Sequence, residues 1–394
     1  MRILFINETE KMVGGAEQII HSTMKLLDSN GHKVKLIATT DTLQTLKVFL
    51  RSFFSIRYFI KTLNAINEFN PDVIHVHNCS RYISPSPIFT AIFKNKKVVM
   101  TVHDFIYYCP RGWGINWKGE ICREGFSLNC FFRNCNSPRK GKKNILLNFL
   151  KSIRILFHRY ILKYFVKTFI CPSTTLKKYL KRSLKLKEEK LVYLPNFIDM
   201  KVQENQKIEK KNNQFLFVGR LSKEKGIDVL IKAIEIAKKD CPKILVKIIG
   251  DGPERRNLEN LTKKLNLQDN IKFLGRIPNE KLSQYYQESL ALIMPSIWME
   301  NCPIVALEAM MNKTPIIASN IGGLPDLVGH NKNGYLFKMG DYKELASYIK
   351  KLYNNVEVSK KMGECGFKKV KREFSKERYY KKLTEIYKNV IKKE

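Results

Sequence analysis

Short apolar runs alternate with amphipathic segments along this chain, and this alternation constrains the fold more than any other feature of the sequence. In the first half, the apolar runs are rich in Val, Ile and Phe and cover residues 2–6, 32–39, 72–78, 97–105, 168–173 and 191–199. Runs of this length, separated by helical patterns, are typical of parallel strands that helices cover on both faces. We therefore predict an α/β protein with a doubly wound parallel sheet.

The pattern starts again after a charged, apolar-poor segment at residues 201–214, which we interpret as a linker. Further apolar runs cover residues 214–220, 243–250, 270–275, 291–296 and 315–320. A chain of 394 residues is long enough for two domains with separate cores. We predict Rossmann-like domains over residues 1–200 and 201–374, with a C-terminal helix at about residues 375–394 packing back on the first. If the domains face each other across a cleft, the carboxyl ends of their strands meet one ligand.

The net charge of +35 is large and unevenly distributed. Residues 139–187 contain no Asp or Glu, and Lys and Arg alternate there with bulky apolar residues. The charge allows several partners: nucleic acid, an anionic membrane surface or phosphorylated ligands; it could also reflect a lysine-rich proteome. No helix-turn-helix, RNP or zinc-finger spacing supports nucleic acid. A basic amphipathic helix on an anionic membrane surface fits better, with a core helix whose solvated face is basic as the alternative.

Membrane insertion and secretion are not expected from the sequence. No window offers about 18 uninterrupted apolar residues, and the N-terminus lacks the pattern of a signal peptide. We therefore expect a cytoplasmic location, with binding to the inner face of the cell membrane as a further hypothesis.

Four of the nine cysteines lie close together in the sequence, at Cys109, Cys122, Cys130 and Cys135. In a reducing compartment a structural zinc ion is a sharper hypothesis than disulfides. The spacing lacks a C-x-x-C pair, so simple packing of cysteines in a long insertion is the alternative.

The stretch IWMENCPIVALEAM, residues 297–310, holds two acids around an apolar run. Pro303 is tolerated only near the start of a helix, so we predict a helix from about Cys302, with Glu300 in the loop before it. The first-turn N–H groups of Ile304 and Val305 then form an anion site. Glu308 lies one turn further, on a buried apolar helix, and we expect it to be an unpaired carboxylate that needs hydroxyl donors.

A basic loop, GRLSKEKG at residues 219–226, directly follows an apolar run. Arg220 and Lys225 place two cations at the end of a strand, where they suit a diphosphate; a solvated basic turn is the alternative. The backbone near Ile277, after the run at residues 270–275, could line a pocket for a base.

Taken in order, these motifs resemble the retaining glycosyltransferases of family 4, which have the GT-B fold. The resemblance covers nearly the whole chain. It rests on GGAE (14–17), VHD (102–104), PNFID (195–199), GRLSKEKG, GDGP (250–253), E-x7-E (300–308), PIIASNIGGLPDLV (315–328) and NGYLF (333–337).

The resemblance implies a role for each matching residue. Arg220 and Lys225 would hold the donor diphosphate, Glu300 would bind the hydroxyls of the donor sugar, and Glu308 would bind the ribose. Gly15 would bring its N–H to the phosphates, since a Gly-Gly turn allows close backbone approach. His103 would touch the donor sugar near the reacting centre; a satisfied buried histidine is the alternative.

We predict a retaining hexosyltransferase that uses a UDP- or GDP-sugar and no catalytic metal, because no Asp-x-Asp pair ends a strand. The acceptor would be a glycan or lipid-linked intermediate of polysaccharide, lipopolysaccharide or capsule synthesis, and we expect no nucleic-acid partner. One alternative is a non-catalytic, basic nucleic-acid or anion-binding protein on a Rossmann-like scaffold. A dinucleotide-dependent oxidoreductase is disfavoured because G-x-G-x-x-G is missing after the first run. A catalytically inactive family member is disfavoured because Glu300, Glu308, Arg220, Lys225 and His103 are all present.

Overall fold

The computed structural model describes residues 1–10, 14–39, 51–80, 82–109, 112, 114–116, 120–122, 125–127, 130, 144–199 and 210–392, without the side chains of residues 144–148 and 151. The chain divides into two compact units. The first consists of Met1–Pro195 and Glu377–Glu394, and the second of Asn196–Lys376. The predicted linker at residues 201–214 lies mostly outside the described residues.

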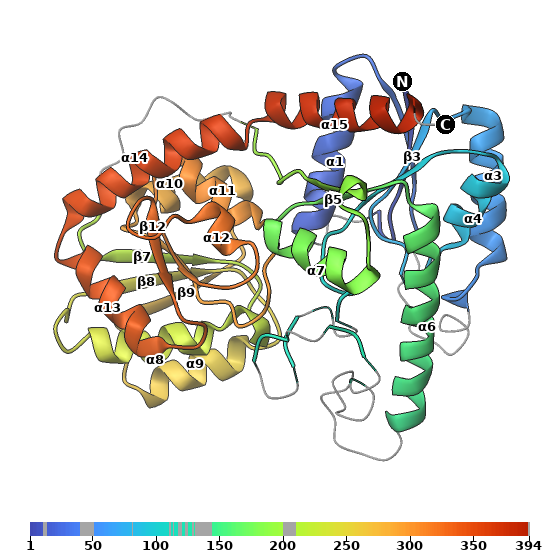
Figure 1. Ribbon diagram of the computed structural model, residues 1–394. Helices are drawn as coiled ribbons and strands as arrows, with labels where there is room; N and C mark the ends of the chain where they lie inside the picture. Colours follow the sequence, from blue (N-terminus) through green and yellow to red (C-terminus); the bar gives the residue numbers. More distant parts are fainter. Residues whose placement is uncertain are drawn as a thin grey trace. The chain divides into compact units, whose positions relative to one another are not determined.

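The first unit contains a parallel sheet with helices on its faces (Figure 1). Its six strands have the order β2-β1-β3-β4-β5-β6. Its strands are β1 (Arg2–Ile6), β2 (Lys33–Ile37), β3 (Val73–Val76), β4 (Val98–Thr101), β5 (Thr168–Cys171) and β6 (Leu191–Tyr193). Its helices are α1 (Gly15–Asp28), α3 (Ile56–Phe69), α4 (Ser86–Phe93), α6 (Asn144–Phe165), α7 (Thr174–Leu184) and α15 (Lys376–Lys392), with a 3-10 turn, η1, at Glu188–Lys190. Every residue of β3, β4 and β5 is buried, as expected for strands covered on both faces.

The second unit contains another six-stranded parallel sheet, in the order β12-β11-β10-β7-β8-β9. Its strands are β7 (Gln214–Val218), β8 (Leu245–Ile249), β9 (Ile271–Gly275), β10 (Leu292–Met294), β11 (Ile316–Ser319) and β12 (Gly334–Phe337). Its helices are α8 (Ile227–Ala237), α9 (Arg255–Lys264), α10 (Asn279–Glu288), α11 (Ile304–Met311), α12 (Leu324–Leu327), α13 (Tyr342–Tyr353) and α14 (Val356–Glu373), with the 3-10 turn η2 at Lys223–Lys225. This strand order is that of the Rossmann dinucleotide-binding fold.

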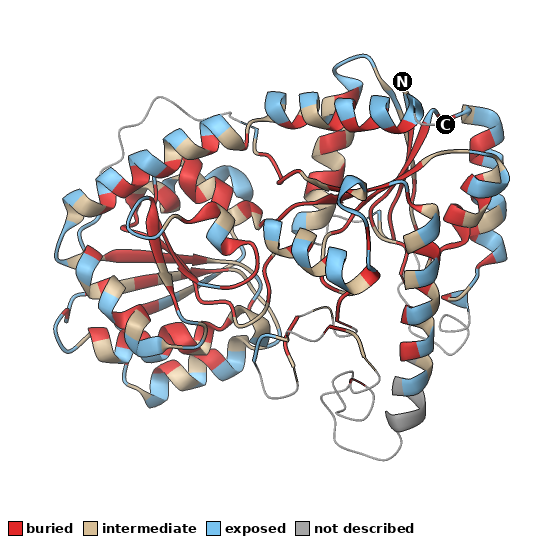
Figure 2. Ribbon diagram, viewed as in Figure 1, coloured by how far each residue is buried: buried red, intermediate tan, exposed pale blue. Residues whose placement is uncertain are grey.

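The prediction of two doubly wound parallel sheets is confirmed. In both units the strands are largely buried and the helices turn an exposed face to solvent (Figure 2). Strand β12 was not predicted as a strand; its four residues follow the turn-forming residues Asn331 and Asn333, and the run is short.

The C-terminal segment forms two helices, α14 and α15, and the second begins at Lys376, close to the expected start at about residue 375. The break lies at Phe374 and Ser375: Phe374 is buried at 2% exposure, its carbonyl accepts from the Ile198 N–H, and Ser375 pairs with Ile198 as an isolated bridge. Tertiary contacts therefore end α14. Beyond the break, α15 contacts the first unit through Tyr379 and Tyr387.

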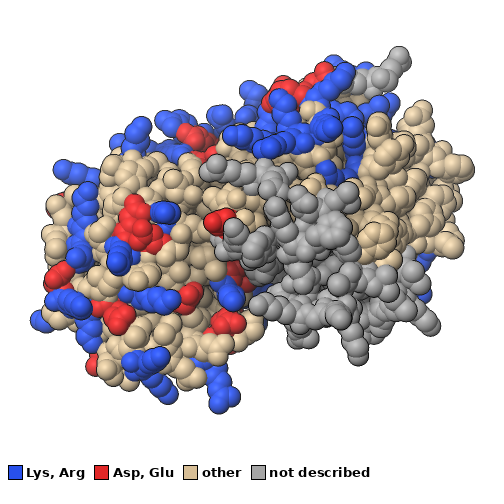
Figure 3. Space-filling view, turned by 60° about the horizontal axis from the view of Figure 1, so that its bottom comes forward, with Lys and Arg blue, Asp and Glu red and all other residues tan. Residues whose placement is uncertain are grey.

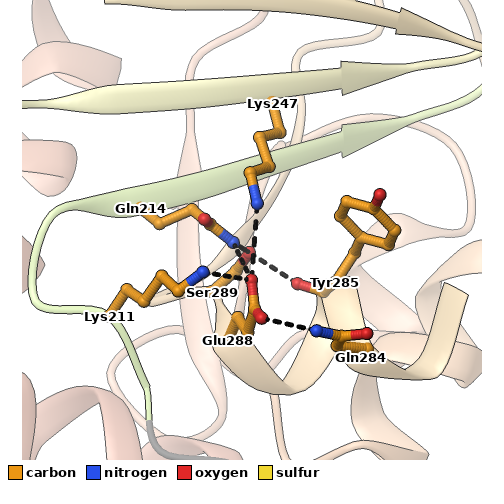
Figure 4. Close-up of polar contacts among 7 residues, drawn as sticks. All are labelled: Lys211, Gln214, Lys247, Gln284, Tyr285, Glu288 and Ser289. Atoms are coloured by element: carbon orange, nitrogen blue, oxygen red, sulfur yellow. Dashed lines mark hydrogen bonds and ion pairs between the residues drawn. The ribbon is translucent and has the colours of Figure 1, made fainter.

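A buried acid, Glu288, joins several side chains near the amino ends of strands β7 and β10 in the second sheet. Glu288, at the end of α10, is 7% exposed. Its carboxylate accepts from Lys211 at 2.9 Å, from Gln284 at 2.9 Å and from Lys247 at 3.4 Å (Figure 4). Burial by itself raises the pKa of Glu288, but these cations and the Gln284 amide outweigh it and lower the pKa to about 2.

Candidate active site

The strand order of the second unit indicates where a ligand would bind. Strands β7 and β10 are neighbours, and the connections from them run to opposite sides of the sheet. Ligands of open α/β sheets bind outside the carboxyl ends of the strands at such a reversal of strand order. The loops that follow β7 and β10 carry Arg220, Lys225 and Glu300, so these residues lie at the expected edge.

Lys225 and Glu300 form an ion pair at this edge. The Lys225 Nζ lies 2.7 Å from Glu300 Oε1, and the Ser296 hydroxyl donates to the same oxygen at 2.7 Å. The Lys225 ammonium also lies 5.2 Å from the centroid of the Trp298 ring. Burial at 5% exposure by itself raises the pKa of Glu300, but Lys225 and Ser296 outweigh burial, and the pKa lies below its ordinary value.

Backbone contacts hold the two loops together. The Ile297 N–H donates to the Glu224 carbonyl at 2.9 Å. Gly226 has φ +65°, and a Cβ there would lie 2.1 Å from the Pro295 carbonyl oxygen. Only glycine allows this approach, which sets Lys225 beside the loop that carries Glu300.

The backbone of Glu300 is held in the same way by Gly322 and Gly323. The Gly323 N–H donates to the Glu300 carbonyl at 2.7 Å. Gly322 has φ +61°, and a Cβ there would lie 2.1 Å from the Glu300 carbonyl oxygen. The two glycines of the IGGLPD segment therefore position an acid that lies more than twenty positions earlier in the chain.

Helix α11 begins at Ile304, with Pro303 as the N-cap residue, rather than near Cys302 as predicted. Pro303 has an extended ψ of 128°, and no side chain caps the helix. The N–H groups of Ile304 and Val305 therefore belong to the first turn, where intrahelical acceptors are lacking. The Asn196 amide donates to the Cys302 carbonyl at 2.7 Å and anchors the loop before the helix.

The expectation that Glu308 is unpaired is wrong. The hydroxyl of Tyr286, from α10, donates to Glu308 Oε2 at 2.9 Å. Burial raises the pKa of Glu308, and the hydrogen bond from Tyr286 opposes this shift. Burial, together with Glu308, also keeps Tyr286 protonated by raising its pKa well above the ordinary value. A protein hydroxyl thus takes one of the acceptor positions that sequence reasoning assigned to a ligand.

Arg220 and Ile277 lie at the same edge of the sheet. Arg220 is exposed, and among the described residues its side chain makes no ion pair. Ile277 follows β9, two strands from β7, and is partly buried. Of the predicted donor-binding residues, the structure joins Lys225 directly to Glu300 and places Glu308 one turn beyond Ile304.

Gly15 and His103 lie in the first unit, at the carboxyl edge of its sheet. Gly15 is exposed and is the first residue of α1, which directly follows the N-cap residue Gly14. His103 follows β4 and is partly buried. Its Nε2 lies 2.8 Å from Nδ1 of His77, and burial lowers the pKa of His103 to about 4.

The cysteine-rich loop is described only in part, and Cys135 lies outside the described residues. Cys109 and Cys130 are buried, and Cys122 is partly buried. Within the described ranges, no three His, Cys, Asp or Glu residues come together in an arrangement that could hold a metal ion.

Sequence reasoning missed the partners that orient the predicted acids and His103: Ser296, Tyr286, Gly322, Gly323 and His77. Ser296 and the glycines lie in motifs that were recognised, but nothing in their spacing told which acid they contact. Tyr286 gave no signal at all, because its partner Glu308 lies on another helix.

Two family models match the chain and together span most of it. Residues 13–202 match the model described as Glycosyltransferase Family 4, and residues 199–369 match Glycosyl transferases group 1.

Similar proteins agree with these matches. An uncharacterized glycosyltransferase of Haemophilus influenzae is 36% identical over 39% of this chain and 43% of its own length. The amylovoran biosynthesis glycosyltransferase AmsK of Erwinia amylovora is 30% identical over 44% of each chain. The chain thus spans less than half the length of these relatives. The crystal structure of Anabaena Alr3699/HepE in complex with UDP has a TM-score of 0.70 and 17% identity, with 99% of this chain and 100% of that chain covered.

Proposed function

We propose that this chain, which belongs to the family 4-like glycosyltransferases with the GT-B fold, transfers a sugar from a nucleotide diphosphate to an acceptor hydroxyl. The observation that carries the proposal is the partly buried Lys225–Glu300 pair at the point where the strand order of the second sheet reverses. A carboxylate fixed by a cation and a hydroxyl suits the hydroxyls of a donor sugar, and neighbouring cations suit its diphosphate.

The proposed donor site uses both ends of the E-x7-E segment. Glu300 would accept hydrogen bonds from the sugar, and Glu308, whose Oε2 is held by Tyr286, would bind the ribose. The N–H groups of Ile304 and Val305, with Arg220 and Lys225, would bind the diphosphate. The backbone near Ile277 would line a pocket for the base. The N–H of Gly15, in the first unit, would donate to the phosphates.

The same groups would stabilise the leaving nucleotide. Negative charge develops on the diphosphate as the sugar–oxygen bond breaks, and preorganised cations and N–H donors lower the energy of that state. A hexosyl donor, retention at the anomeric carbon and UDP or GDP as the nucleotide complete the proposal. The UDP bound to the Anabaena protein supports a uridine nucleotide.

Thermal shift against UDP-, GDP- and ADP-sugars tests the donor site. One nucleotide family should stabilise the protein, Glu308→Ala should weaken nucleotide binding, and Glu300→Ala should reduce discrimination between sugars more than nucleotide affinity. If no sugar nucleotide raises the melting temperature and the protein instead shows a salt-dependent gel shift with nucleic acid, the chain is the non-catalytic alternative.

We further propose that the acceptor is a lipid-linked or surface-glycan intermediate and that the first unit binds an anionic membrane surface. The name of the Erwinia relative, an amylovoran biosynthesis glycosyltransferase, supports the acceptor class. No helix within the described ranges is long and apolar enough to cross a membrane.

The binding surface would be the outer face of α3, α4 and α6, which we call the apolar face. Along α6, five apolar or aromatic side chains that are 39–60% exposed recur at intervals of three or four: Phe149, Ile153, Leu156, Tyr160 and Tyr164. Ile56 and Ile60 of α3 and Phe93 of α4, which are 48–71% exposed, extend this surface.

Charge on the apolar face fits anionic lipid. Exposed Arg57 and Lys61 lie between the apolar residues of α3, the Lys163 ammonium lies 5.3 Å from the Tyr164 ring, and α6 contains no acid. On the side of the first unit where these helices lie, Figure 3 shows a broad surface of uncharged side chains that Lys and Arg side chains border. Aromatic rings at the headgroup level and cations beside them favour an anionic bilayer.

Vesicle flotation at physiological salt tests this surface. The full chain should float with anionic vesicles and not with neutral ones, and the double variant Tyr160→Ser/Tyr164→Ser should float less. Tyr342→Ser, a change at a 36% exposed tyrosine of the second unit, is the matched control. Equal flotation with both kinds of vesicle, or none, would rule out the anionic surface.

A further inference from the structure

Three histidines lie one after another at the carboxyl edge of the first sheet. His75 belongs to β3, His77 directly follows β3, and His103 follows β4. The ring centroids of His75 and His77 are 4.2 Å apart, and those of His77 and His103 are 5.1 Å apart with an interplanar angle of 19°. Sequence reasoning assigned a role only to His103.

The first ring of this row, that of His75, is fully hydrogen-bonded. The hydroxyl of Tyr387 in α15 lies 2.7 Å from its Nδ1, and that of Thr101 lies 2.8 Å from its Nε2. Burial raises the pKa of Tyr387 well above the ordinary value, so Tyr387 keeps its proton and donates to Nδ1. His75 therefore carries its own proton on Nε2, and its ring, held by two hydrogen bonds, packs against the ring of His77.

The next contact joins two uncharged rings. Burial lowers the pKa of His77 well below its ordinary value and that of His103 to about 4, so both are neutral near pH 7. His77 Nδ1 and His103 Nε2 are 2.8 Å apart, and one proton lies between them. The nitrogen that carries this proton determines the tautomer of both rings, because a neutral imidazole has one N–H.

The surroundings of the other nitrogen of His77, Nε2, show which ring carries the shared proton. His77 is 2% exposed, and its Nε2 has no hydrogen-bond partner among the described residues. A proton on Nε2 would be a buried donor without an acceptor, which is rare and costly in folded proteins. A proton on Nδ1 is used in the contact with His103, so His77 is the donor.

We propose that His77 is a positioning residue that holds His103 in the tautomer protonated on Nδ1. In this tautomer Nδ1 of His103 is a hydrogen-bond donor, and not a base, toward a ligand at this edge of the sheet. The assignment of this ligand as the donor sugar rests on the proposed function; the tautomer does not. His77 thereby acts through His103, while His75, Thr101 and Tyr387 hold His77 in place.

The tautomer can be measured on the full chain labelled with ¹⁵N at its seven histidines. Long-range ¹H–¹⁵N correlation spectra distinguish the protonated ring nitrogen from the unprotonated one, and His103→Gln identifies the His103 signals by their loss. We expect a protonated Nδ1 on His103 in the wild type and a mixture of tautomers in His77→Leu, with no change in His21→Asn. A wild-type His103 protonated on Nε2 overturns the proposal, even if His77→Leu fails to fold. So does a His103 tautomer that His77→Leu leaves unchanged.

Kinetics then connect the tautomer to function. In His77→Leu we expect kcat for sugar transfer to fall about 10- to 100-fold, the size of effect known for partners that orient metal-ligating histidines, with little change in the donor KM. A larger effect on KM than on kcat would contradict a positioning role. If the wild type neither binds nor transfers a sugar nucleotide, the proposed function fails, and the tautomer result is unaffected.

Discussion

Replacing Lys225 by Met leaves Glu300 buried without its cation, and the structure sets the size of the effect. Glu300 is 5% exposed and keeps the hydrogen bond from Ser296. Loss of one partner of a buried ion pair lowers the free energy of unfolding by about 3–5 kcal/mol when the remaining group stays charged. Glu300 can avoid a buried, unpaired charge by taking up a proton. From an ordinary pKa of 4.5 this costs about 3.4 kcal/mol at pH 7, since each pH unit corresponds to about 1.36 kcal/mol.

We therefore expect Lys225→Met to lower the free energy of unfolding of the second unit by about 3 kcal/mol at pH 7. The loss should shrink toward about 1 kcal/mol at pH 5.5, because protonation there is less costly. In the wild type the pKa of Glu300 is lowered on folding. Its contribution to stability is thus present above the ordinary pKa and is lost as the pH falls through the folded value. The two proteins should converge as the pH falls.

Hydrogen exchange after equilibration in urea measures this effect, because peptides of the two units are read separately by mass spectrometry. Lys223→Met is the matched control: it removes an exposed cation of the same 3-10 turn. Glu300→Gln combined with Lys225→Met should remove the pH dependence. A loss that does not change between pH 7 and 5.5, or that equals the loss in Lys223→Met, would refute this reasoning.

Three further changes test the contacts around the candidate site and the second sheet. Gly322→Ala brings a Cβ to 2.1 Å from the Glu300 carbonyl oxygen and should lower the free energy of unfolding by about 1–3 kcal/mol more than Gly340→Ala. Gly340 has a similar φ of +79°, but a Cβ there meets nothing within 4 Å. Equal melting temperatures of the two variants would contradict the clash. Glu288→Gln should lower the free energy of unfolding by about 1–3 kcal/mol at pH 7. Because the pKa of Glu288 is lowered to about 2, this difference should disappear between pH 4.5 and 2 in urea titrations, and its persistence there would exclude a charge effect. Tyr286→Phe should cost about 1 kcal/mol and weaken nucleotide binding a few-fold in calorimetry; unchanged affinity would separate Glu308 from the ligand.

The two sheets and the loops that carry the predicted site can be recognised from local sequence. Strand runs such as residues 72–78 and 214–220 are apolar enough to be recognised locally, because strands buried on both faces leave no polar alternation. Pro303 likewise restricted the start of α11 to within two residues, because a proline interrupts the hydrogen bonds of a helix interior.

The hydrogen-bond partners of the site residues, by contrast, follow from the fold. Whether Glu308 is unpaired depends on Tyr286, 22 positions earlier on another helix, and Glu300 is held by glycines more than twenty positions later. The bridge between Ser375 and Ile198, at the break between α14 and α15, likewise joins residues that lie far apart in the chain. Local sequence fixes backbone propensity and the period of burial, whereas a hydrogen bond between distant residues exists only once the sheet order has brought its two atoms together.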